Sequence, residues 1–182
     1  MQIRETGLPG LRILSPTVHK DHRGFFLESF REEFFQGLDE PVHFIQDNHA
    51  RSEEAGVLRG LHYQAPPAAQ TKLIWVSRGA AFDVAVDLRR SSPTYGKSFS
   101  LTLTPDNFLR LLIPKGFAHG YMTLEPGTEF HYKVDHYYSP EHEGGLRWND
   151  PALAIDWPVG TPIMTERDMR WPELADLPVI FA

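Results

Sequence analysis

The chain has 182 residues, of which 41% are hydrophobic, and this suits one β-rich domain spanning residues 1–182 with a real core. Its formal net charge of −6 disfavours non-specific binding to nucleic acid or anionic membranes as a main activity, and the absence of cysteine excludes disulfides and thiolate metal sites. Because the chain has no secretion signal and no run of about 18 apolar residues, we expect a cytoplasmic protein that does not span a membrane.

The first predicted element is a helix within residues 28–38, ESFREEFFQGL. There Phe30, Phe34 and Leu38 recur every four residues, and Gly37 stands near the end. Helix-like patterns are otherwise scarce. Only the tail at residues 165–177 favours another short helical turn.

The other predicted elements are short strands, in a chain punctuated by 15 prolines and 14 glycines. They fall at residues 56–64, 70–77, 82–88, 98–104, 107–114 and 128–134. Period-two alternation between close turn signals favours antiparallel strands in a sandwich or barrel. In the strand at 82–88 we assign Asp83 and Asp87 to the polar face of a sheet.

The predicted strand GVLRGLHYQ, residues 56–64, carries two polar residues that packing does not require. Arg59 and His62 have opposite parity, so a regular strand would separate them. A bulge near Gly60 would let both reach one cavity.

Three further polar residues interrupt the apolar pattern of other predicted strands: Lys72, His119 and Tyr132. Each alone has a structural explanation, as a Lys that extends to solvent, a hydrogen-bonded core His and an amphipathic Tyr. Together with His62 they lie on separate strands that could converge in one barrel. That convergence favours a functional cavity.

A metal site is the first alternative for such a cavity. Residues 114–119, PKGFAH, resemble the second half of the metal-binding cupin pattern. The first half is missing because residues 60–64 offer one histidine where that pattern has two, and Thr123 stands where the metal-binding version tends to have Asn. A metal would therefore need other His or carboxylate ligands.

Nucleophilic hydrolysis, nucleotide-dependent phosphoryl transfer and hydride transfer lack their usual motifs. What remains is a histidine base, a phenol acid and a cation. A base can remove a proton beside a carbonyl, a cation can stabilise the enolate, and an acid can return the proton from the other face. This is the minimum equipment for an epimerisation.

Seven blocks of the sequence closely resemble the dTDP-4-dehydrorhamnose 3,5-epimerases. They are residues 21–29, 44–52, 56–64, 69–96, 113–124, 132–140 and 148–158. The resemblance implies an all-β, cupin-type jelly-roll barrel with a few short peripheral helices, a homodimer, and no metal or organic cofactor. It also implies that dTDP-4-dehydro-6-deoxy-D-glucose is epimerised at C3 and C5 via an enolate, which gives dTDP-4-dehydro-L-rhamnose for dTDP-L-rhamnose biosynthesis.

The resemblance also implies roles for individual residues. By position, His62 is similar to the family's base and Asp168 to the carboxylate that orients it, while Tyr132 is similar to the acid and Lys72 to the enolate stabiliser. The positions implied to bind substrate are Arg23, Phe26, Glu28, Gln46, Asp47, Asn48, Arg59, Lys72, His119, Tyr138, Glu143 and Arg167.

Two alternatives stay open at the level of sequence. One is a 3-epimerase of a dTDP-4-keto-6-deoxysugar in another deoxysugar pathway, since the same base and acid would serve it. The other is a non-catalytic sugar-nucleotide sensor or a metal-binding cupin. The joint presence of base and acid argues against a sensor, which needs neither.

Overall fold

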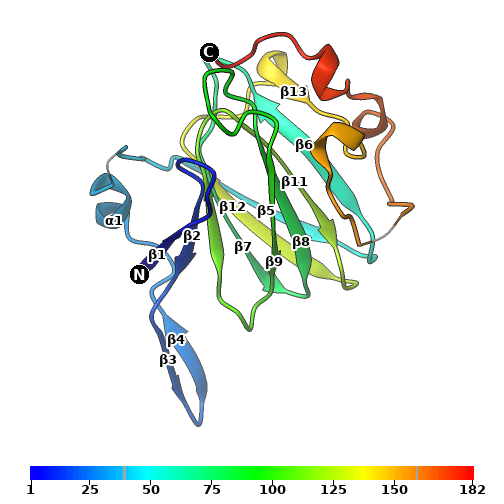
Figure 1. The fold of residues 1–182 in the computed structure, drawn as a ribbon. Coiled ribbons are helices and arrows are strands. Elements are labelled where there is room, and N and C mark those ends of the chain that lie inside the picture. The colour runs from blue at the N-terminus through cyan, green and yellow to red at the C-terminus, as the bar shows by residue number, and fades with distance from the viewer. Residues whose placement is uncertain (39, 159) are drawn as a thin grey trace.

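Two antiparallel sheets face each other in the computed structural model, which describes residues 1–38, 40–158 and 160–182 (Figure 1). The strand order is β1-β2-β10-β7-β12-β5 in the six-stranded sheet and β13-β6-β11-β8-β9 in the five-stranded sheet. Most neighbouring strands are distant in sequence, and successive strands cross between the sheets, as in a jelly roll. The prediction of an all-β jelly-roll barrel is confirmed.

The strands of the six-stranded sheet are β1 (Gln2–Glu5), β2 (Arg12–Ser15), β10 (Arg110–Ile113), β7 (Lys72–Arg78), β12 (Thr128–Val134) and β5 (Gln46–Ser52). Those of the five-stranded sheet are β13 (Glu143–Gly145), β6 (Leu58–Gln64), β11 (Phe117–Thr123), β8 (Ala81–Asp87) and β9 (Ser98–Leu103). A separate hairpin consists of β3 (Val18–Asp21) and β4 (Gly24–Leu27).

The helix predicted within residues 28–38 is shorter than expected: α1 spans Glu32–Gln36. Arg31 before it has an extended backbone, and Gly37 ends it. Phe30 lies outside the helix and stacks on Phe35, with ring centroids 5.3 Å apart.

The predicted helical turns of the tail are present as the 3-10 helices η3 (Asp168–Arg170) and η4 (Leu174–Asp176). Two more 3-10 helices, η1 (Pro140–His142) and η2 (Pro151–Leu153), precede them. No helix among the described residues is long and apolar enough to cross a membrane.

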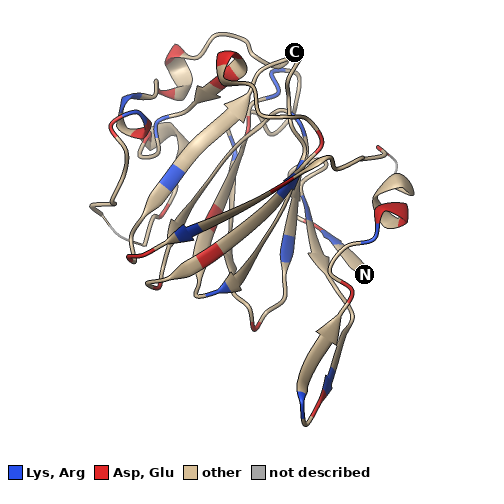
Figure 2. Cartoon of the chain, turned by 180° about the vertical axis from the view of Figure 1, so that it is seen from behind, with Lys and Arg blue, Asp and Glu red and all other residues tan. Residues whose placement is uncertain are grey.

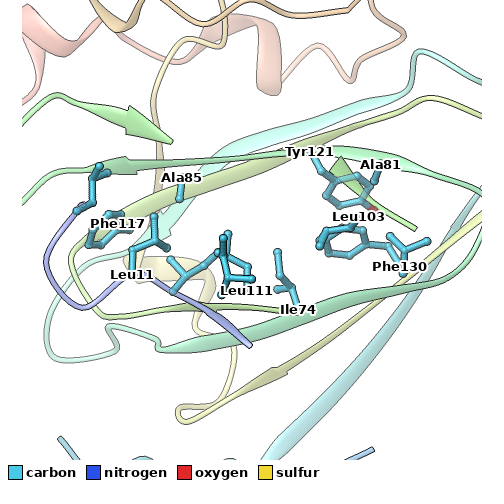
Figure 3. Packing of buried hydrophobic residues seen from close by; sticks show 13 residues of the cluster. Leu11, Ile74, Ala81, Ala85, Leu103, Leu111, Phe117, Tyr121 and Phe130 are labelled. Atoms are coloured by element: carbon cyan, nitrogen blue, oxygen red, sulfur yellow. The ribbon is translucent and has the colours of Figure 1, made fainter. Parts of the chain in front are cut away.

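The main core fills one part of the space between the sheets, and Figure 3 shows its side chains. Ile74 and Phe130 come from the six-stranded sheet, while Ala85 and Tyr121 come from the five-stranded sheet. The rings of Tyr121 and Phe130 lie parallel, with centroids 3.8 Å apart. This aromatic contact stabilises the packing of the two sheets against each other. The main core does not fill the whole interior, and the rest is available for a cavity.

The outer face of each sheet is also covered in part. The C-terminal segment, orange to red in Figure 1, packs Leu146, Leu153 and Phe181 onto the five-stranded sheet. Phe35 of α1 packs on the six-stranded sheet, as does Val42. Strand β8 therefore has no solvent-facing side.

The polar face to which Asp83 and Asp87 were assigned does not meet solvent, because both residues are 0% exposed. Val84 packs under the C-terminal segment, whereas Ala85, on the same side as the two aspartates, faces the barrel interior. Asp87 accepts hydrogen bonds from Arg89, Ser92 and Thr94 and so fixes the turn that follows β8. The alternation of apolar and acidic residues along β8 therefore reflects a barrel interior that is partly polar.

The β3–β4 hairpin projects from the body of the barrel (Figure 1). It carries Phe25 and Phe26, which are 60% and 71% exposed. Figure 2 shows both signs of charge along it. Large apolar side chains on a projecting hairpin are typical of a surface that contacts a partner.

Candidate active site

A cavity of about 450 Å³ lies inside the barrel between the two sheets. Its lining includes the following residues singled out from the sequence: Gln46, Asn48, Arg59, His62, Lys72, His119, Tyr132, Tyr138, Glu143, Arg167 and Asp168. The structure thus brings together polar residues from both sheets and from the C-terminal segment. A concave site with convergent polar groups is the expected form of a small-molecule site.

His62 on β6 is held by a carboxylate from η3. Its Nε2 lies 2.7 Å from Oδ1 of Asp168, whose side chain is 4% exposed. Burial acts to raise the pKa of Asp168, but hydrogen bonds from His62, the Gly60 backbone and Trp171 outweigh it and hold that pKa below its usual value. Asp168 is therefore ionised at neutral pH and accepts the Nε2 proton. This tautomer leaves the Nδ1 lone pair of His62 available as a base.

The backbone at Gly60 departs from a regular strand, as predicted. The pairing of β11 with β6 shifts register between His119 and Tyr121, and Gly60 has a φ of 128°. A Cβ atom at Gly60 would lie 2.6 Å from the Cα of Gly120, so the position requires glycine. The irregularity lets Arg59 and His62, of opposite parity, line the same cavity.

Tyr132 on β12 enters the cavity from the opposite sheet. Burial raises the pKa of its phenol above the ordinary value of 10, and the charge of Glu143 adds to this, while Arg59 counteracts it. The phenol therefore holds its proton at neutral pH. It is equipped to donate that proton to a carbanion.

Lys72 on β7 lies close to Tyr132 in the register, because Ile74 pairs with Tyr132 and Val134 pairs with Lys72. Enclosure by protein lowers the pKa of its ammonium to about 8, against the opposing charges of Asp83 and Glu143. Lys72 is still mostly protonated at pH 7. A partly buried ammonium interacts more strongly with an adjacent oxyanion than one in bulk water does.

The mouth of the cavity is organised around Glu143. Its Oε2 accepts hydrogen bonds from the Tyr138 hydroxyl at 2.9 Å and from Arg167 Nη1 at 2.7 Å. On β5, Gln46 Nε2 donates to Asn48 Oδ1 at 2.9 Å, and Gln46 Oε1 accepts a hydrogen bond from the Tyr138 backbone at 3.2 Å. These groups combine an exposed aromatic ring with a cation, a combination suited to a nucleobase and a phosphate.

Four of the residues implied to bind substrate do not line the cavity. Arg23, Phe26 and Glu28 belong to the projecting hairpin or its exit. Asp47 alternates with the lining residues of β5 and so faces outward, where its Oδ1 accepts a hydrogen bond from Lys133 at 2.7 Å. Within one chain, Arg23, Phe26 and Glu28 therefore do not contribute to the cavity.

Sequence reasoning missed several residues of the site. Tyr121 lines the cavity and shares strand parity with His119, and Gln64 lines it and shares parity with His62. Those parities could have identified both residues. Gln64 Oε1 accepts a hydrogen bond from the Ser139 backbone at 2.7 Å, which anchors the segment that carries Tyr138. Asp83, which we assigned to the polar face of a sheet, does not line the cavity but pairs with His119, which does.

A group of metal-type ligands occurs elsewhere. Within the described ranges, His49, Glu129 and His131 place ligand atoms within 4.8 Å of one another. Their strand positions alternate with those of Asn48 and Tyr132, so they lie on the outer face of the six-stranded sheet. This cluster is separate from the cavity.

The known proteins that this chain is similar to include dTDP-4-dehydrorhamnose 3,5-epimerases and a related monoepimerase. The sequence profile of a family described as dTDP-4-dehydrorhamnose 3,5-epimerase matches residues 5–176. A curated protein of that name from Sinorhizobium fredii is 45% identical over 182 residues, which is 100% of this chain and 93% of the relative. A crystal structure of an enzyme of that name from Bacillus anthracis, with TDP and PPi bound, is 48% identical with a TM-score of 0.91, covering 94% of this chain and 98% of that one. ChmJ, a 3'-monoepimerase from Streptomyces bikiniensis in complex with dTDP-quinovose, is 32% identical with a TM-score of 0.87, covering 93% and 86%.

Proposed function

The chain belongs to the dTDP-4-dehydrorhamnose 3,5-epimerase family, and from this we propose that it performs the family's reaction with His62, Tyr132 and Lys72. The substrate is dTDP-4-dehydro-6-deoxy-D-glucose, and inversion at C3 and C5 gives dTDP-4-dehydro-L-rhamnose. The observation that carries the assignment of roles is the arrangement of base and acid. His62 with Asp168, and Tyr132 with Lys72, reach one cavity from opposite sheets.

Both reacting carbons flank the C4 carbonyl, so one set of groups serves both steps. His62 Nδ1 removes the proton from the carbon, and the electron pair moves into the carbon–carbon bond of an enolate. The ammonium of Lys72 stabilises the negative charge on O4. The Tyr132 hydroxyl then gives its proton to the carbon from the opposite face, which inverts the configuration. Asp168 stabilises the imidazolium that forms.

The two protonation states must be reset between the steps. After the first inversion His62 is protonated and Tyr132 is a phenolate. Proton exchange with solvent returns both groups to their starting forms, and the exposed mouth of the cavity allows water to reach them. The substrate therefore acquires solvent hydrogen at each inverted carbon.

A homodimer would account for the residues that the single chain leaves apart. The nucleotide-binding positions Arg23, Phe26 and Glu28 lie on or beside the projecting hairpin, and Phe26 is 71% exposed. If the hairpin of one subunit reaches the cavity of its partner, these residues complete the nucleotide site in trans. A cytoplasmic location would match a substrate that is made from nucleoside triphosphates.

Deuterium exchange tests the reaction. The protein is incubated with dTDP-4-dehydro-6-deoxy-D-glucose in D2O, and C3 and C5 are followed by NMR. We expect deuterium and inversion at both carbons. Deuterium at neither carbon would contradict the proposal, and deuterium at C3 alone would identify a 3-epimerase like the Streptomyces bikiniensis protein. Metal analysis of the active protein provides a further check, because activity that depends on stoichiometric metal would contradict proton-only chemistry.

A further inference from the structure

A second histidine–carboxylate pair lies deep in the barrel, and the mechanism above assigns no role to its carboxylate. Asp83 is 0% exposed and its Oδ2 lies 2.8 Å from Nε2 of His119, which is 7% exposed. Asp83 comes from β8 and His119 from the adjacent β11, where it pairs in register with His62 of β6. His119 also lines the cavity.

One oxygen of this buried carboxylate has no partner. Among the described residues, Asp83 Oδ1 makes no hydrogen bond, although it is fully enclosed. A buried carboxylate with an unpaired oxygen costs stability, and apolar residues of similar size would fold at least as well. The cost is understandable if the charge acts on another group in the cavity.

Lys72 lines the same cavity as His119, the partner of Asp83, and is the cation on which we expect this charge to act. Enclosure lowers the pKa of Lys72 to about 8. The negative charges of Asp83 and Glu143 oppose this shift, and Asp83 has the larger effect. Conversely, burial raises the pKa of Asp83, while His119 and Lys72 both act to lower it. The titratable groups around Lys72 come from several strands: Asp83 of β8, His119 of β11, Glu143 of β13 and, beside it in the register, Tyr132 of β12.

We propose that Asp83 is a positioning residue for the epimerisation: it is the buried counter-charge that keeps Lys72 protonated, and it fixes the orientation and tautomer of His119. This inference rests on the proposed function, in which Lys72 stabilises the enolate. Asp83 is not among the residues that line the cavity, and it acts through these two side chains.

The hydrogen bond to Asp83 also decides what His119 presents to the cavity. Burial lowers the pKa of His119, so its imidazole is neutral at pH 7. Its Nε2–H donates to Asp83, which leaves Nδ1 as an acceptor. Such an acceptor suits a sugar hydroxyl, and a protonated His119 would instead repel the Lys72 ammonium.

The test is Asp83→Asn, which keeps the size of the side chain and removes its charge. An opposite charge nearby shifts a pKa by about 1 to 3 units, so the alkaline limb of the kcat profile should move down from near pH 8 by about one unit or more. At pH 8 this lowers kcat about fivefold or more relative to the unmodified protein, and at pH 6 the ratio is much closer to one. A purely structural effect would give the same ratio at both values.

The matched control is Asp87→Asn, on the same strand and the same side. Asp87 is also 0% exposed, but its partner is Arg89, which does not line the cavity, whereas the partner of Asp83 is the cavity-lining His119. This variant should lose thermal stability while its rate relative to the unmodified protein stays constant from pH 6 to pH 9. It separates the loss of a buried carboxylate from the loss of the carboxylate beside Lys72.

A direct titration keeps the proposal testable if the variant is slow. NMR of protein labelled with ¹³C at lysine Cε follows the ionisation of Lys72 without substrate, and Lys72→Arg identifies its signal. Asp83→Asn should lower the titration midpoint. An unchanged midpoint, or a rate ratio that does not vary with pH, would overturn the inference, provided that the unmodified protein exchanges deuterium at C3 and C5. If the unmodified protein exchanges at neither carbon, the proposed function fails, whereas the titration of Lys72 still reports on Asp83.

Discussion

His62 and Tyr132 enter one cavity from opposite sheets of the barrel, His62 from β6 of the five-stranded sheet and Tyr132 from β12 of the six-stranded sheet. A sugar ring bound between them would present one face to the imidazole and the other to the phenol. Inversion at carbon requires removal and return of a proton on opposite faces. The two-sheet architecture therefore supplies the geometry of epimerisation.

The first prediction concerns the base. His62→Ala should reduce turnover by about 10²–10⁴-fold, because it removes the imidazole that Asp168 orients as the proposed base. Affinity for dTDP, measured by titration calorimetry, should change by no more than about twofold, because the ring at Tyr138 and the cation at Arg167 remain. Turnover that persists near the original rate would mean that another residue removes the proton.

The second prediction concerns the irregular strand. Gly60→Ala should lower the free energy of unfolding by about 2–4 kcal/mol and also impair activity. The new Cβ atom would lie 2.6 Å from the Cα of Gly120 and 2.9 Å from the carbonyl oxygen of His119, and the φ of 128° disfavours alanine. Denaturant unfolding measures the change. Gly160→Ala is the control, since a Cβ there meets no atom within 4 Å, and its effect should stay within about 0.5 kcal/mol. Equal stability of the two variants would contradict the close approach of β6 and β11.

The strands and their faces were accessible from the sequence, as residues 82–88 illustrate. Alternation placed Val84 and Val86 on one side and Asp83 and Asp87 on the other, and the structure keeps this division. Alternation could not show that both sides are covered and that neither meets water. That depends on the C-terminal segment, including Phe181, which packs on β8 from almost one hundred residues away.

The candidate site likewise contains residues that the sequence alone could place and residues that it could not. The parity of Arg59 and His62, with a glycine between them, was enough to predict an irregular strand at one cavity. The position of Asp168 could not be derived from periodicity, because it depends on how the tail returns to β6, and only family resemblance indicated it. For Arg23 and Phe26, the resemblance indicated a role, but the hairpin that carries them projects from the body of the barrel, and neither residue lines the cavity of its own chain.

The third prediction tests whether the hairpin completes the partner's site. A chain with Arg23→Ala and Phe26→Ala should lose most of its activity at low substrate concentration, although neither residue lines its own cavity. Co-expression with a His62→Ala chain should restore activity. Half of randomly formed dimers are mixed and each has one intact site, so about a quarter of the unmodified activity should return.

The same experiment has a clear opposite outcome. If the hairpin serves its own subunit, every mixed dimer contains two defective sites, and no activity returns above that of the separate variants. Sedimentation of the unmodified protein provides the control for assembly, and a monomer at micromolar concentration would exclude the exchange of hairpins.

The last prediction concerns the acid. In Tyr132→Phe the ring still packs beside Phe130, but no phenol can return the proton. His62 can still remove a proton and, after exchange with solvent, give back deuterium on the same face. The variant should therefore incorporate deuterium with retention of configuration, while inversion falls by about 10²–10⁴-fold. NMR resolves the two outcomes, since exchange and inversion change different signals.

The control variant is Tyr121→Phe, which removes another hydroxyl of the cavity. It should still invert configuration, because that hydroxyl is not the proposed proton donor. Inversion that survives in Tyr132→Phe would show that the proton comes from another donor.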